Sequence, residues 1–325
     1  MKRKLLLLLC VMIILTVVGA IIAIAINPKT ETSVNQEGKK IQVVTTFYPM
    51  YIIGLNIIDG IDSIELKNLT SKNTGCLHDY QLTTEDMKIL ASADVLIMNG
   101  GGMENFIEDI IKNYPQLLVI DASKGITMLK RETDLLAQTE GDFNSHVWLD
   151  PKLYINQIEN VRDGLTSYLD SMGLDEEDIP KSILNNAQTY IQKVSDLDRE
   201  IEESLLPMTN MSDLAGRKKE AVIFHDAFAY LASRIGLTVA YTVQMGTDTT
   251  LSAGEIADVI DLVKKDKIKY LFTELQYSDS IAKRIEDETD ASVYVIDSIV
   301  TGDGSKDSYL NAMHQNILVL QDALQ

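Results

Sequence analysis

The feature that most constrains the fold is an alternation of short apolar segments with helical patterns, which occurs twice along the chain. The strand-like segments are IQVVTTF (41–47), SIELKNLT (63–70), DVLIMNG (94–100) and QLLVIDAS (116–123), then AVIF (221–224), TVAYTV (238–243), KYLFTEL (269–275) and SVYVIDS (292–298). Strands that alternate with helices of about 10–15 residues favour parallel sheets flanked by helices. The sequence therefore predicts an α/β protein.

Two helical stretches separate the two alternating halves. Asp150-Pro151 is typical of a helix start, with Asp as the cap and Pro in the first turn. The second stretch, from Ser182 to about Leu206, repeats apolar residues every three or four positions, which places them on one helical face. We therefore predict two similar lobes joined by one long helix. The predicted divisions are an N-terminal lobe at 41–165, connecting helices at 166–210 and a C-terminal lobe at 211–325.

The N-terminal segment predicts the cellular compartment. Lys2, Arg3 and Lys4 precede an uncharged apolar run of 22 residues, from Leu5 to Ile26. At about 1.5 Å per residue this run reaches roughly 33 Å, enough to cross a bilayer. Basic residues before the run predict that the rest of the chain lies outside the cytoplasm. We expect residues 1–26 to be a membrane anchor, or a signal segment that is cleaved, followed by a flexible stalk at 27–40.

Charge and cysteine content exclude some classes of protein. The chain has 48 acidic and 29 basic residues and a net charge of −19, which argues against binding to nucleic acid. Cys76 is the one cysteine outside the apolar run, so no intramolecular disulfide is expected there. We expect Cys76 to be a packed or half-exposed loop thiol.

Three of the four histidines lie at or beyond the ends of predicted strands, where such folds place their ligands. Ligands of α/β proteins bind beyond the carboxyl ends of the strands. His225 and Asp297 directly follow strands, Glu274 lies at the end of another, and His78 and His146 lie in loops of the first half. Imidazole and carboxylate groups suit Zn²⁺, and also Mn²⁺ or Fe²⁺. No compact motif links these residues, so spacing alone leaves open that they are ordinary surface residues.

Other candidate motifs do not support a function. Asn99-Gly100-Gly101-Gly102 follows a strand, but it lacks the third glycine of a dinucleotide loop and the Lys-Ser/Thr of a phosphate loop. We expect a close backbone turn there. His314 lies within a predicted helix and is not expected to bind metal.

Several segments together resemble the zinc- and manganese-binding receptors of ABC transporters, a cluster of solute-binding proteins. The segments run in order from about residue 41 to the end. They are VVTTFYPMY (43–51), HDY (78–80) with TED (84–86), ADVLIMNGGGME (93–104), HVWLDP (146–151), HDAF (225–228), and the strand ends at Glu274 and Asp297.

The resemblance implies one divalent cation in a cleft between the lobes, carried to an ABC permease for uptake. His78 and His146 from the first lobe, with His225 and Asp297 from the second, would bind the cation. Glu274 would orient His225 or serve as an alternative ligand. Three imidazoles and one carboxylate favour zinc, with manganese as the next choice. The expected protein is a monomer and not an enzyme.

The chain departs from the family pattern in several places. Leu77 precedes His78 where the family usually has proline, and Gln81 replaces a common acidic residue. Residues 125–145 contain no histidine, which weakens a zinc-scavenging role, and the lipid-attachment motif of many relatives is missing. Two alternatives remain open: a membrane-tethered zinc hydrolase with Glu274 as the base, and a surface adhesin with a structural metal.

Overall fold

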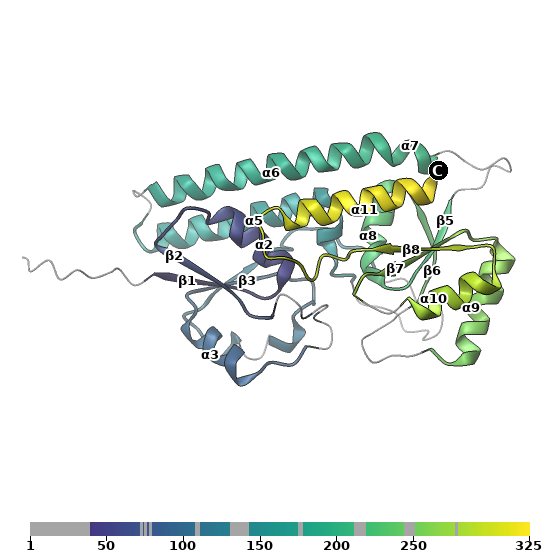
Figure 1. Cartoon of the computed structure of the whole chain (residues 1–325). Coiled ribbons are helices and arrows are strands. Elements are labelled where there is room, and N and C mark those ends of the chain that lie inside the picture. Colours follow the sequence, from purple (N-terminus) through teal and green to yellow (C-terminus); the bar gives the residue numbers. More distant parts are fainter. Residues whose placement is uncertain are drawn as a thin grey trace, which may run out of the picture. The chain divides into compact units, whose positions relative to one another are not determined.

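The computed structural model contains the predicted alternation of strands and helices (Figure 1). It describes residues 40–71, 74, 77, 80–107, 111–130, 143–174, 178–210, 219–243, 251–276 and 279–325. The expected anchor at 1–26, nearly all of the stalk, Cys76 and His78 lie outside the described residues. Within the described part, no helix is both long enough and apolar enough to cross a membrane.

Two four-stranded sheets carry the fold, and every strand pair in them is parallel. The first sheet has the order β2 (Ile64–Asn68), β1 (Ile41–Thr45), β3 (Val95–Met98) and β4 (Leu118–Asp121). The second has the order β6 (Thr238–Thr242), β5 (Glu220–Ile223), β7 (Tyr270–Glu274) and β8 (Ser292–Ile296). Both sheets therefore follow one topology, as predicted for two similar lobes.

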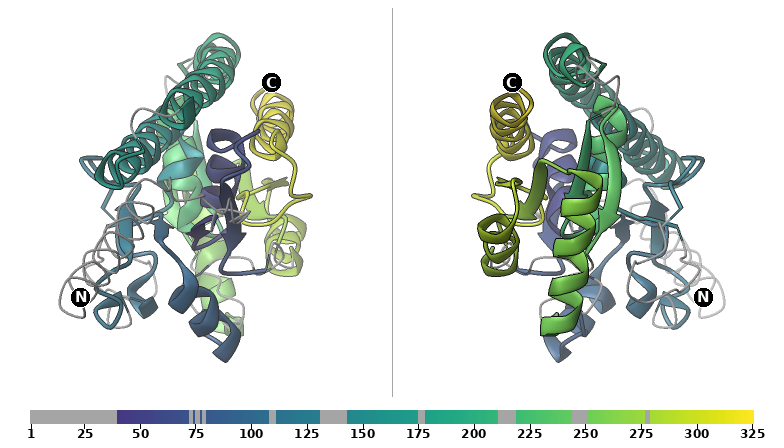
Figure 2. Two further views of the ribbon diagram at one scale, coloured as in Figure 1. Left: turned by 90° about the vertical axis from the view of Figure 1, so that its left-hand side faces the viewer. Right: turned by 90° about the vertical axis from the view of Figure 1, so that its right-hand side faces the viewer.

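Helices cover both faces of the sheets. They are α2 (Tyr48–Ile57), α3 (Thr84–Ser92), α5 (Pro151–Ser171), α6 (Asp178–Ser204), α7 (Leu206–Asn210), α8 (Ala229–Ile235), α9 (Ala253–Asp266), α10 (Ser280–Glu288) and α11 (Ser308–Leu324). Short 3-10 helices lie at η1 (Asn105–Ile107), η2 (Val147–Leu149) and η3 (Asp226–Phe228). Within residues 40–325, α5, α6 and α11 lie together on one side, and α9 and α10 lie on the other (Figures 1 and 2).

Alternate residues of each strand enter different cores. In the first sheet, Val44 and Leu96 pack with the residues beneath α3, and in the second, Val222 and Leu271 pack with α9 and α10. The residues beside them enter one large core that draws on both sheets and on α5, α6 and α11; its strand members include Val43, Val95, Ile97, Ile120, Ala221, Ile223, Phe272 and Ile296. Residues 40–325 accordingly form one compact unit. The division into lobes at residues 165 and 211 stays a prediction.

The long helix α6 has 27 residues and spans about 40 Å at its rise of 1.5 Å per residue. Its buried face enters the shared core through Ile183, Ala187, Tyr190, Val194, Leu197 and Ile201. The helix begins at Asp178, four residues before the predicted start. Pro180 lies in its first turn, where a missing backbone N–H costs no helical hydrogen bond.

Helix starts follow local sequence signals. The Asp150 side chain accepts from the Lys152 N–H and caps α5, as predicted. Reciprocal capping boxes begin α3, with Thr83 and Asp86, and α9, with Ser252 and Glu255.

The segment after β3 begins with the glycine turn that the sequence predicts. Gly100, Gly101 and Gly102 have φ values of 80°, 63° and 84°, so the chain turns sharply here, as expected for a close turn. The turn leads into the 3-10 helix η1, and residues 108–110 lie outside the described part.

Candidate metal centre

His225 lies two residues after the end of β5, and its imidazole faces the end of the neighbouring strand β7. Its Nδ1 is 2.9 Å from Oε1 of Glu274, the last residue of β7. Both side chains are buried, and Glu274 Oε2 has no hydrogen-bond partner among the described residues. A carboxylate acceptor at Nδ1 fixes the imidazole orientation and directs Nε2 away from Glu274. The carboxyl ends of two adjacent strands thus bring these residues together.

His146 lies just before the 3-10 helix η2 and is fully buried. Its Nδ1 is 2.9 Å from Oδ1 of Asn144, and its backbone N–H donates to the same oxygen at 3.0 Å. The ring lies against Trp148, with 5.1 Å between the ring centroids. The local chain therefore holds this imidazole through two contacts with one amide side chain.

The two imidazoles meet between the sheets. The ring centroids of His146 and His225 are 4.8 Å apart, and the planes are inclined by 79°. Asp226 Oδ1 lies 3.6 Å from His146 Nδ1 and 3.5 Å from His225 Nε2. One ligand atom from each of these three buried residues lies within 4.8 Å of the other two. Two imidazoles and one carboxylate are suitable donors for zinc and related divalent metals.

Asp226 is the member of this cluster that the sequence analysis missed as a functional residue. It directly follows His225 and is the first residue of the 3-10 helix η3, which leads into α8. An acidic residue in a first helical turn is ordinary because it complements the helix dipole. The sequence offered one indication. Asp226 directly follows His225, which was predicted to lie at a strand end, within the HDAF segment (225–228).

The remaining predicted ligands lie apart from this cluster or outside the described residues. Asp297 follows β8 and is half-buried, and its Oδ1 accepts from Gln276 Nε2 and from the Ile299 N–H, both at 2.8 Å. It does not belong to the group of ligand atoms found among the described residues. His78 lies outside those residues. His314 is on α11, where its Nε2 is 3.0 Å from Glu200 Oε2.

The glycine turn supports the segment that carries His146. Asn99 donates through Nδ2 to the Ser145 carbonyl at 2.9 Å. The turn is held by the buried Glu104 carboxyl, which accepts from Thr46 and from the backbone N–H groups of Asn99 and Gly100. Burial raises the pKa of Glu104 to about 7. Glu104 is therefore linked, through hydrogen bonds of Asn99, to the segment that carries His146.

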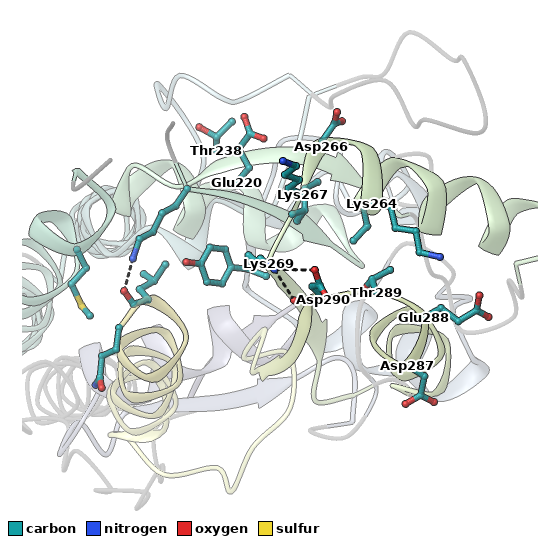
Figure 3. Close-up of a pocket in the computed structure, with 17 residues that line it drawn as sticks. Glu220, Thr238, Lys264, Asp266, Lys267, Lys269, Asp287, Glu288, Thr289 and Asp290 are labelled. Carbon is teal, nitrogen blue, oxygen red and sulfur yellow. Dashed lines mark hydrogen bonds and ion pairs between the residues drawn. The ribbon is translucent and has the colours of Figure 1, made fainter. Parts of the chain in front are cut away.

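A large hollow lies elsewhere, at the amino ends of the strands of the second sheet (Figure 3). Its volume is about 1520 Å³, and lysines and carboxylates line it together. Lys269 Nζ lies 3.6 Å from Asp290 Oδ2, and Lys219 donates to the Leu324 carbonyl. This hollow is at the opposite end of the strands from His225 and Glu274. It contains neither of the clustered histidines.

The arrangement of the two sheets and the long helix is the fold of a known class of solute-binding proteins. A structure of the solute-binding protein FpvC from Pseudomonas aeruginosa, in complex with Mn²⁺, matches with a TM-score of 0.73 and covers 88% of this chain and 99% of FpvC. The sequences are 24% identical over the match, so it establishes the fold.

The family follows from the sequence comparison. Residues 43–323 match the family model described as the zinc-uptake complex component A, periplasmic, and the chain belongs to this family. The iron-binding protein YfeA of Yersinia pestis is 28% identical over 294 residues, covering 88% of this chain and 87% of YfeA. The high-affinity zinc uptake system protein ZnuA of Bacillus subtilis is 25% identical over 311 residues, covering 92% of each. The predicted resemblance to metal receptors is confirmed, and the family is extracytoplasmic.

Proposed function

We propose that this protein captures a divalent transition metal outside the cytoplasm and hands it to an ABC permease, without catalysing a reaction. Zinc is the preferred cargo and manganese the alternative. The observation that carries the proposal is the buried cluster of His146, His225 and Asp226 between the two sheets. Buried imidazoles that converge with a carboxylate are typical of a site for a cation.

The proposed ligands are His78, His146, His225 and Asp297. Three imidazoles and one carboxylate suit four-coordinate zinc. Asp226, which lies against both described imidazoles, contributes negative charge beside the cation. The two relatives are named for different metals, iron and zinc, so the choice of zinc rests on this donor set.

Delivery requires the metal to leave a site whose parts are tightly held. The inner faces of both sheets share one core, and α6 contributes to it along much of its length. We therefore expect release through a local movement of the ligand-bearing segments when the protein docks on its permease. The protein acts as a monomer tethered by residues 1–26, or released after their cleavage.

Isothermal titration of the metal-stripped full-length protein with Zn²⁺ and Mn²⁺ tests the proposal. We expect one tight equivalent of Zn²⁺, weaker binding of Mn²⁺, and loss of tight binding in His225→Ala. His314→Ala is the matched control because it removes an exposed histidine paired with Glu200, and it should bind zinc normally. The absence of a tight site in the wild type would refute metal capture. Turnover of an ester or peptide by the zinc-loaded protein would favour the hydrolase alternative.

A further inference from the structure

Asn144 connects the two segments that carry the clustered histidines. Its side chain is buried, with 1% exposure. Oδ1 accepts from the backbone N–H of His146 and faces His146 Nδ1, while Nδ2 donates to the Asp226 carbonyl at 2.7 Å. One amide thus contacts the ligand-bearing segment of the first lobe and the residue next to His225 in the second.

The surroundings of this amide determine its orientation. The His146 backbone N–H can only donate, and the Asp226 carbonyl can only accept. A flipped amide would place NH₂ against the N–H and oxygen against the carbonyl, so both contacts would be lost. Asn144 Oδ1 must therefore face His146.

The amide orientation in turn determines the tautomer of His146. An amide oxygen can only accept, so a hydrogen bond at 2.9 Å requires the proton to lie on His146 Nδ1, and the Asp226 carboxylate, 3.6 Å from the same nitrogen, favours the same tautomer. The lone pair of the neutral imidazole then lies on Nε2, so Nε2 is the nitrogen able to donate to a metal. Glu274 has the same effect on His225 through a carboxylate.

The backbone of Asn144 is held across the same boundary. Its carbonyl accepts from the Tyr230 hydroxyl of α8 at 2.6 Å, and the same hydroxyl oxygen accepts from the Leu129 N–H at 3.0 Å. The Asn144 N–H donates to the Leu129 carbonyl at 2.8 Å. These contacts limit how far the residue can move relative to either sheet.

We infer that Asn144 is a positioning residue for metal capture. It fixes His146 with Nε2 as its metal-binding atom, and it holds the segments that carry His146 and His225 in a fixed relative position. The inference rests on the proposed function and deepens it. Partners of metal-binding histidines typically change metal affinity by about 10–100-fold when they are removed.

Nitrogen-15 NMR of the histidine side chains in the metal-free protein tests the tautomer directly. At mildly alkaline pH, wild-type His146 should carry its proton on Nδ1. Asn144→Asp keeps an oxygen acceptor and should retain this tautomer, whereas Asn144→Ala should lose it. Retention of the Nδ1–H tautomer in Asn144→Ala would overturn the inference.

Zinc titration of the same variants tests the consequence for binding. Asn144→Ala should weaken zinc binding by about 10–100-fold. Asn186→Ala is the matched control, since Asn186 Nδ2 also donates to backbone carbonyls, those of Ile57 and Asp59, away from the histidines. Unchanged affinity in Asn144→Ala, or an equal loss in Asn186→Ala, would overturn the positioning role. If the wild type binds no zinc, metal capture fails, while the NMR comparison still decides whether Asn144 sets the tautomer.

Discussion

The two described histidines reach the same place by different means. His225 is positioned by its own sheet, because it lies two residues after β5 and meets Glu274 at the end of the neighbouring strand β7. His146 does not end a strand, and its position depends on Asn144, on the glycine turn and on contacts with the second lobe. One half of the site is therefore built into a sheet, and the other is assembled from tertiary contacts.

This difference has a chemical counterpart. The partner of His225 is a carboxylate, and the partner of His146 is a neutral amide. A carboxylate partner raises the basicity of a metal-binding imidazole more than an amide does. The comparison predicts that perturbations of the two halves have different effects on stability and on binding.

The largest expected effect concerns the support of the His146 half. Burial raises the pKa of Glu104 to about 7 from its usual 4.5, so the folded state binds more protons between these values. The contribution of Glu104 to the unfolding free energy is fully present below the lower pKa. It falls by about 3 kcal/mol as pH rises through the higher pKa. Urea unfolding of the metal-free protein at about pH 5 and about pH 7 should record about 2 kcal/mol of this change. Glu104→Gln should flatten the dependence, and an equal slope in the variant would assign it to other groups.

The second effect separates the two carboxylates of the second lobe. Asp297→Asn removes a proposed ligand and should weaken zinc binding by at least about 100-fold, beyond the usual effect of outer partners. Asp226→Asn removes neighbouring charge and should weaken it by about tenfold. Calorimetric titration of both variants measures the difference. The reverse order would make Asp226 the ligand and leave Asp297 as a structural residue.

A smaller effect is expected when the two histidines are given similar partners. Glu274→Gln keeps an oxygen opposite His225 Nδ1 and removes the charge, so it resembles the Asn144 contact. Zinc affinity should fall by about tenfold, at the low end of the range for such partners. A loss as large as that of His225→Ala would show that Glu274 itself binds the metal, as the alternative role predicted from the sequence requires.

The smallest effect tests the contacts that hold the His146 segment from the second lobe. The Tyr309 hydroxyl on α11 donates to the Trp148 carbonyl at 2.8 Å, and both residues are fully buried. Tyr309→Phe leaves this carbonyl without its donor and should lower the unfolding free energy by about 1 kcal/mol. Denaturant unfolding measures the change. An unaltered midpoint would mean that the contact contributes nothing to the interlobe packing.

The sequence predicts those features of the fold and of the site that depend on local patterns. Short apolar segments identified the strands, and Asp150-Pro151 identified the start of α5. The positions of His225 and Glu274 followed because parallel strands place their carboxyl ends at one edge. In each case the deciding information lies within a few neighbouring residues or in the fold class.

The features that depend on contacts between distant segments could not be predicted in this way. Asn144 and Asp226 lie 82 positions apart, and their contact depends on how the two sheets face each other. Asn144 also lies in a segment without a strand or helix pattern, so no periodicity marks it. The shared core could not be predicted either. A strand pattern indicates that a residue is buried, but not which other residues pack against it.

The shared core has a consequence for how the protein denatures. Hydrophobic side chains from both sheets and from α6 pack in one cluster, so neither sheet can lose its inner packing without exposing the other. Two domains with separate cores could melt in separate steps, but residues 40–325 should absorb heat in a single calorimetric peak, with equal calorimetric and van't Hoff enthalpies. Bound zinc should shift that peak upwards as a whole.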